Sequence, residues 1–119
     1  MSETILIVED DPTQIRMLGT LIRKNLGYEA AQALNGAEGI DYLKDNHANI
    51  GLVILDMQMP VMDGMEALDI IRAQYPTLPV IMLTGAKESK YAVTAMKKGA
   101  SDFLTKPYDA HKMVITIQN

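Results

Sequence analysis

The feature that most constrains this chain is a set of short apolar blocks in which hydrophobic and polar residues do not alternate. The blocks occupy residues 5–8, 52–55, 80–83 and, more briefly, 103–104. Short runs rich in Val and Ile are typical of strands buried on both faces, as in a parallel sheet that helices cover on each side. A weaker block at residues 28–31 predicts a further strand at an edge of the sheet.

Segments in which apolar residues recur with the period of a helix separate these blocks. The first helix is expected to open at Asp11-Pro12, because an acid caps the helix and the proline nitrogen needs no partner, and to stop at Gly27. His47 and Tyr75 are expected to be the last residues on the buried faces of the second and third helices. The later helices are predicted at residues 37–47, 68–75, 89–98 and from 109 onward.

The alternation of strands and helices predicts one doubly wound α/β domain that occupies residues 1–119. A chain of 119 residues suits a single domain and offers no linker or internal repeat. The last helix has only residues 110–119 in which to run, and the chain stops within its amphipathic stretch. We therefore expect either a segment cut from a longer protein or an unusually short final helix.

The composition excludes several classes of function. Eleven Lys plus Arg against fifteen Asp plus Glu give a net charge of -4, which argues against nucleic-acid and anionic-membrane binding by this domain. The chain has no Cys, so disulfides, thiolate metal sites and cysteine nucleophiles are excluded, and its two His are too separated for a zinc site. Apolar runs too short for a membrane span and the lack of a signal-peptide layout predict a cytoplasmic protein.

The residues that directly follow the apolar blocks are the candidates for a site, because open α/β sheets bind ligands beyond the carboxyl ends of their strands. Taken singly, each has an ordinary explanation: Asp11 caps a helix, Asp56 begins a turn, and Thr84 is structural. With Asp11 kept as the helix cap, together they place three acids, a hydroxyl and an amine at one edge of the sheet. The full set is Glu9, Asp10, Asp11, Asp56, Thr84, Gly85, Ala86, Lys106 and Pro107.

Carboxylates gathered at one edge repel each other. Two of them about 5 Å apart cost roughly 3 kcal/mol at an effective dielectric constant near 20. Lys106 together with a hard cation would relieve this repulsion, and an oxygen-only site suits Mg²⁺, whereas no loop with the EF-hand spacing for Ca²⁺ is present. An aspartate carboxylate in such a site can attack phosphorus and hold it as an acyl phosphate.

Four stretches in order make the chain resemble, over its whole length, the receiver domains of two-component response regulators. They are ILIVEDD at residues 5–11, VILDMQMPVMDG at 53–64, MLTGA at 82–86 and GASDFLTKP at 99–107. The resemblance implies a flavodoxin-like fold like that of the chemotaxis regulator, with a five-stranded parallel sheet in the order 2-1-3-4-5 and five helices. Residues 92–107 are most similar to receivers of nitrogen-regulation-type transcriptional activators.

Positions within these motifs imply the chemistry of the site. Asp56 would accept a phosphoryl group from a sensor histidine kinase or a phosphotransfer protein, as part of a signalling domain rather than an enzyme in the usual sense. Thr84 and Lys106 would bind the phosphoryl oxygens, and Lys106-Pro107 resembles the family's cis peptide. The ligands of Mg²⁺ would be Glu9, Asp10, Asp56 and the backbone carbonyl of Gln58.

The resemblance also implies a switch formed by Thr84 and Phe103. Because Phe103 lacks the hydroxyl of the common Tyr, we expect its buried orientation to be populated before phosphorylation; the alternative is that Phe103 is a fixed core residue. The output surface would be the helix at 89–98, the last strand and the last helix, which would contact a downstream effector domain or a second copy of the chain. Activators of the nitrogen-regulation type carry an ATPase and a DNA-binding module downstream.

Two other interpretations remain open at this stage. A haloacid-dehalogenase-type hydrolase also uses a strand-end Asp and Mg²⁺, but it requires a second acid two positions on, where this chain has Gln58. A degenerate receiver that binds partners without phosphorylation is disfavoured because all the site residues are present. Nucleotide binding is excluded, because no glycine-rich phosphate loop follows the first block. Near Asp56, Met57, Met59, Met62 and Met65 are interpreted as adaptable packing, with partner contact as the alternative.

Overall fold

A five-stranded parallel sheet forms the centre of the chain in the computed structural model, which describes residues 4–85 and 89–118. The spatial order β2-β1-β3-β4-β5 and the parallel pairing of all neighbours confirm the predicted fold class. The edge strand runs slightly later than the predicted residues 28–31. The strands are β1 (Thr4–Val8), β2 (Glu29–Ala33), β3 (Ile50–Asp56), β4 (Val80–Thr84) and β5 (Asp102–Thr105).

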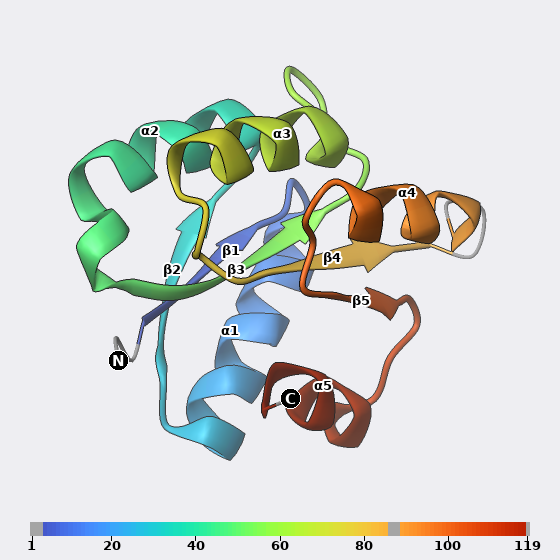
Figure 1. Ribbon diagram of the computed structural model, residues 1–119. Coiled ribbons are helices and arrows are strands. Elements are labelled where there is room, and N and C mark those ends of the chain that lie inside the picture. The colour runs from blue at the N-terminus through green and yellow to red at the C-terminus, as the bar shows by residue number, and fades with distance from the viewer. Residues whose placement is uncertain (1–3, 86–88, 119) are drawn as a thin grey trace.

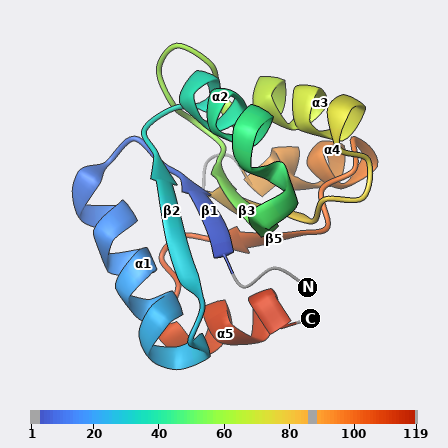
Figure 2. The same ribbon diagram turned by 90° about the vertical axis from the view of Figure 1, so that its left-hand side faces the viewer.

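Helices cover both faces of the sheet (Figure 1). One face carries α1 (Pro12–Leu26) and α5 (Ala110–Gln118), and the other carries α2 (Gly36–Asn46), α3 (Gly64–Gln74) and α4 (Ala92–Lys97). The view in Figure 2 shows the same two layers from the side. In the described part of the chain, no helix combines the length and the apolar character needed to cross a membrane.

The two layers explain why the strand blocks do not alternate in polarity. Along β1, Ile5 and Ile7 pack into a core beneath α1 and α5, whereas Leu6 and Val8 pack into a second core beneath α2 and α3. All four side chains are at most 3% exposed. Successive residues of a strand point to opposite faces, so burial on both faces requires an unbroken apolar run.

Local signals set the ends of the helices as predicted. The Asp11 side chain accepts hydrogen bonds from the backbone N–H groups of Thr13 at 2.9 Å and Gln14 at 3.5 Å, and Pro12 is the first residue of α1. Gly27 follows α1 with a φ of 72°, a left-handed conformation that glycine adopts without strain. The short α5 is also capped as predicted, because Asp109 accepts from the N–H of Lys112 at 2.8 Å.

Three details of the predicted helices are wrong. His47 is exposed, because α2 ends at Asn46 and the chain tightens into a 3₁₀ turn (His47–Asn49) that rotates His47 off the buried face. Tyr75 lies just beyond the end of α3 rather than within it, although its half-buried side chain does pack against the core beneath α2 and α3. The fourth helix is shorter than residues 89–98, since Ser89–Tyr91 form another 3₁₀ turn before α4 begins at Ala92.

The methionines after β3 contribute packing, as predicted. Met57 is 5% exposed and belongs to the core beneath α2 and α3. Met59, Met62 and Met65 are partly buried and pack against the same core. Flexible thioether side chains fill an irregular loop without demanding a single shape, which suits this position.

Candidate functional site

The carboxyl ends of the central strands bring three acids together. Glu9 and Asp10 follow β1, and Asp56 is the last residue of β3, the strand beside it. The chain winds in opposite directions from these two strands, which is where ligand crevices form in open α/β sheets. One carboxylate oxygen from each of Glu9, Asp10 and Asp56 lies within 4.8 Å of the others. Asp11 serves as the cap of α1, as predicted.

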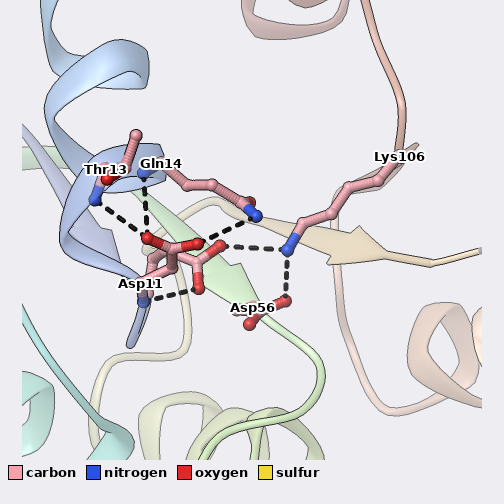
Figure 3. A network of polar contacts seen from close by, with 6 residues as sticks. Asp11, Thr13, Gln14, Asp56 and Lys106 are labelled. Carbon is pink, nitrogen blue, oxygen red and sulfur yellow. Dashed lines mark hydrogen bonds and ion pairs between the residues drawn. The ribbon is translucent and has the colours of Figure 1, made fainter.

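Lys106 reaches this cluster from the end of β5 (Figure 3). Its Nζ donates to Oε1 of Glu9 at 3.0 Å and to Oδ1 of Asp56 at 3.1 Å. The other oxygen of Glu9 accepts the backbone N–H of Asp11 at 3.2 Å. One ammonium is therefore shared between two carboxylates that are 2% and 6% exposed, so it offsets part of the repulsion expected between them.

The two carboxylates that share the ammonium have pKa values shifted in opposite directions. Burial opposes the ionisation of Glu9, but hydrogen bonds from Lys106 and from the Asp11 N–H lower its pKa below the usual value. Burial and the negative charge of Glu9 raise the pKa of Asp56 to about 7, against the opposing effect of Lys106. Burial also opposes the charge on Lys106, yet its two carboxylate partners raise its pKa.

This division predicts an unusual pH dependence of stability without metal. The pKa of Asp56 is near 3.8 when unfolded and about 7 when folded, so the folded state binds the extra proton between these values. Its contribution is fully present below pH 4 and is lost as the pH rises through 7. The free energy of unfolding should fall with a slope approaching about 1.4 kcal/mol per pH unit.

Denaturant titrations in a chelator at several pH values measure this slope. The Asp56→Asn variant provides the comparison, because it cannot ionise at this position and should show a flatter profile and a higher stability at pH 8. Equal slopes for the two proteins between pH 5 and pH 7 would contradict the assignment of the titration to Asp56.

The two predicted switch residues lie on the strands β4 and β5. Thr84 ends β4 and is 0% exposed, and its hydroxyl donates to that of Thr105 across the sheet at 3.5 Å. Phe103 is 38% exposed on the edge strand β5 and belongs to neither core. The expected buried orientation of Phe103 and the fixed core alternative are both wrong for this structure, because Leu104 takes the buried position of β5 and Phe103 is exposed.

Two further residues near the site were not identified from the sequence. Thr105 pairs in register with Thr84, and only the alignment of β4 with β5 makes these hydroxyls neighbours. Tyr108 follows Lys106-Pro107, whose peptide bond is cis. Tyr108 packs against the core beneath α1 and α5, and burial raises the pKa of its phenol. Its position directly after Lys106-Pro107, which were predicted site residues, could have identified Tyr108 from the sequence.

The donor set of the cluster fits a hard divalent cation. All three side chains offer carboxylate oxygens, no nitrogen or sulfur donor belongs to the group that the structure describes, and Asp10 is exposed and accessible. Gln58, predicted to add its backbone carbonyl, follows the buried Met57 and has an exposed side chain. Ala86, also part of the predicted site, lies outside the described residues.

Comparison with known proteins places this geometry in a family. Residues 5–118 match the response regulator receiver domain. The transcriptional regulatory protein ZraR of Klebsiella oxytoca is 36% identical over 113 residues, which cover 95% of this chain and 25% of ZraR. The nitrogen assimilation regulatory protein NtrX of Azorhizobium caulinodans is 35% identical over 115 residues, which cover 97% of this chain and 25% of NtrX. The chain spans about a quarter of the length of these relatives.

Solved structures agree with this placement. A response regulator receiver domain protein from Clostridium thermocellum superposes with a TM-score of 0.93 at 34% identity, covering 100% of this chain and 93% of that one. The receiver domain of NtrX from Brucella abortus superposes with a TM-score of 0.85 at 33% identity, covering 96% and 94%. The fold, the acids at the strand ends and the sequence match all agree. The chain belongs to the response regulator receiver domains of two-component systems, and its relatives include nitrogen-regulation-type transcriptional regulators.

Proposed function

We propose that Asp56 accepts a phosphoryl group from the phosphohistidine of a sensor kinase or a phosphotransfer protein. The observation that carries this proposal is the position of its carboxylate, which ends the central strand beside two other acids and 3.1 Å from the Lys106 ammonium. An Asp56 oxygen attacks phosphorus while the phosphorus–nitrogen bond breaks. The imidazole leaves with the electron pair and then takes up a proton.

Other residues of the site would bind the negatively charged oxygens of the phosphoryl group as it is transferred. The Lys106 ammonium, held between Glu9 and Asp56, is already at the place where phosphoryl oxygens would arrive. The Thr84 hydroxyl would exchange its contact with Thr105 for a phosphoryl oxygen. Because only the ionised carboxylate attacks phosphorus, the raised pKa of Asp56 means that part of the metal-free population is protonated and unreactive at neutral pH.

Glu9, Asp10 and Asp56, together with the backbone carbonyl of Gln58, would hold Mg²⁺. The oxygen-only donor set supports this assignment. Bound Mg²⁺ would offset negative charge on the carboxylates and on the phosphoryl oxygens. Glu9 keeps both of its oxygens engaged, with Lys106 and with the Asp11 N–H, so the exposed Asp10 is the acid most free to change partners.

Magnesium should therefore stabilise the native chain and have little effect on Asp10→Asn. A ligand at a hundredfold excess over its Kd stabilises a folded protein by about 2.7 kcal/mol, which raises Tm by several degrees. Thermal unfolding with and without Mg²⁺ measures this difference. The matched control is Asp41→Asn, since the side chain of Asp41 on α2 is 76% exposed and lies outside the acidic group. Equal gains for all three proteins would place the metal elsewhere.

The phosphoryl group would also move the switch. The Thr84 side chain must turn away from Thr105 to reach the phosphoryl group. This movement would pull the chain that follows β4 toward the phosphorus. The Phe103 side chain is exposed on β5, so it could rotate inward when the phosphoryl group is added. The surface that changes would comprise α4, β5 and α5, and it would act on a downstream effector region or on a second copy of this chain.

Thr84→Ala should uncouple the site from this surface. In NMR spectra, a beryllofluoride mimic of the phosphoryl group should still bind the variant, but the shift changes around α4 and Phe103 should shrink markedly. Thr105→Ala is the control, because it removes the partner of Thr84 while leaving the Thr84 hydroxyl in place, and it should retain the full changes. Full-sized shift changes in Thr84→Ala would contradict this role and would mean that the coupling runs through Lys106 or the loop after Asp56.

The direct test of the phosphoacceptor proposal uses phosphoramidate, a small donor with a phosphorus–nitrogen bond. With Mg²⁺ present, intact-protein mass spectrometry should show the addition of one phosphoryl group, and hydroxylamine should remove it as it does an acyl phosphate. A modification that resists hydroxylamine, or none, would contradict the proposal.

A further inference from the structure

The two ends of α4 differ in how firmly they are held. At its beginning, Tyr91 occupies the capping position but gives the helix no side-chain hydrogen bond within the described residues, and Tyr91 and Val93 are 46% and 64% exposed. At its end, Ala95 and Ala100 are buried in the core beneath α2 and α3, and the N–H of Ala100 donates to the carbonyl of Ala95 at 3.0 Å. The core therefore holds the turn between α4 and β5, whereas the first turn of α4 lies largely in solvent.

An ion pair joins the end of α4 to α3, its neighbour on the same face of the sheet (Figures 1 and 2). The Nζ of Lys98, directly after α4, donates to both carboxylate oxygens of Asp69 on α3, at 3.1 and 3.0 Å. The two side chains are 38% and 54% exposed, so this pair alone would hold the helix weakly. A second contact at the same turn strengthens the attachment.

That second contact is between Arg72 of α3 and Gly99. A Cβ on Gly99 would lie 2.8 Å from the Nε and 3.0 Å from the Cγ of Arg72, and Gly99 has a φ of 108°, which only glycine adopts readily. The guanidinium is fixed in place, because its Nη1 donates to the carbonyls of Tyr75 at 3.1 Å and Pro76 at 2.8 Å. Its Nε is buried with no hydrogen-bond partner in the described part of the chain. A contact that leaves a buried donor unpaired calls for a reason beyond packing.

The helix α3 is in turn fixed to the strand that carries the phosphoacceptor. The N–H of Gly64, its first residue, donates to the carbonyl of Met57 at 2.9 Å, and a Cβ on Gly64 would lie 2.8 Å from the Met57 Cα. Leu68 and Ile71 bury the inner face of α3, with exposures of 0% and 1%. Contacts to α3 thus hold the turn between α4 and β5 in a fixed position relative to the end of β3.

We propose that Asp69 and Arg72 make this turn a fixed pivot, so that α4 answers the phosphoryl group by tilting at its first turn. The inference rests on the proposed phosphoacceptor function and specifies how its output surface changes shape. Because α4 follows β4 in the chain, a pull that begins at Thr84 reaches the beginning of α4 first. With the other end held, the helix rotates about that end instead of shifting as a whole. Tyr91 and Val93 therefore move most.

Distances between spin labels measure the tilt directly. The chain has no Cys, so two introduced cysteines can be labelled without a competing site. One label at Asp41→Cys, an exposed position on α2, is the reference, and the second is at Val93→Cys or Lys97→Cys, both exposed on α4. With Mg²⁺ and beryllofluoride, the distance to Val93→Cys should change and the distance to Lys97→Cys should not. Equal displacement of both labels, or displacement of neither, would overturn the inference.

The contacts with α3 are tested by breaking and rebuilding them. Asp69→Lys places two cations opposite each other, and Arg72→Ala removes the packing on Gly99, so in each variant the label at Lys97→Cys should also move. Adding Lys98→Asp to Asp69→Lys rebuilds the pair with reversed charges and should fix this label again. The matched control is Glu66→Lys, the same charge change at an exposed position in the first turn of α3, and it should behave like the native chain. A label that stays fixed in both Asp69→Lys and Arg72→Ala would show that these contacts do not form the pivot.

Phosphoramidate labelling separates this inference from the function on which it rests. If phosphoramidate fails to label the native chain, the phosphoacceptor proposal is wrong and the tilt falls with it. If labelling succeeds, the phosphoacceptor proposal stands and the spin-label distances alone decide whether α4 pivots about its end.

Discussion

Asp56→Asn should take up no phosphoryl group, either from phosphoramidate or from a phosphorylated kinase fragment. The amide has nearly the shape of the carboxylate, and its oxygen can still accept from Lys106, but its neutral oxygen is too weak a nucleophile to attack phosphorus. The fold should remain intact, because the substitution removes a buried charge that faces Glu9. Mass spectrometry of the intact protein provides the measurement, and circular dichroism checks the fold.

The control for this experiment is a second acid close in sequence. Asp63 caps α3 by accepting from the N–H of Glu66 at 2.9 Å, and Asn caps a helix about as well as Asp. Asp63→Asn should thus be labelled like the native chain. If Asp56→Asn is labelled undiminished, another residue is the acceptor and the assignment fails.

Gly64→Ala should destabilise the chain by about 3 kcal/mol or more. The added methyl group would overlap backbone atoms rather than flexible side chains, since it would clash with the Asp56 carbonyl oxygen and lie 2.8 Å from the Met57 Cα. Relief of this overlap must displace either α3 or the end of β3. The same displacement should slow labelling of Asp56 by phosphoramidate. Denaturant unfolding measures the first effect, and the labelling rate measures the second.

Gly19→Ala is the matched control, with an effect of opposite sign. Gly19 lies inside α1, where its added Cβ would make ordinary contacts at 3.6 to 3.8 Å. Alanine in a helix interior is favoured over glycine by about 1 kcal/mol, so this variant should be more stable than the native chain. Equal destabilisation by both substitutions would show that close backbone approach at Gly64 is not the cause.

The parts of the fold that follow local rules were predictable from the sequence. Asp11 and Gly27 mark the ends of α1 because capping and positive φ depend on a few neighbouring residues. The continuous apolar blocks predicted a sheet covered on both faces. Because parallel strands end at one edge, Glu9, Asp56 and Lys106 could be expected to meet there, and they do.

The remaining features depend on how separate elements lie against each other. Phe103 is exposed, and α4 is shorter than the helix that the sequence favoured there. The contact of Thr84 with Thr105 depends on the register between two strands. The left-handed Val61 runs against its own residue preference, so no propensity argument could have located it.

The ammonium at the site comes from the far end of the chain. Lys106 lies 97 positions after Glu9 and 50 after Asp56. During synthesis the acids leave the ribosome well before Lys106, and in the folded chain the pairing of β5 with β4 is what brings its ammonium to them. If Lys106 is needed for phosphoryl transfer, as proposed above, a chain in which β5 has not yet paired with β4 would accept no phosphoryl group, and unfinished or misassembled chains would carry no signal.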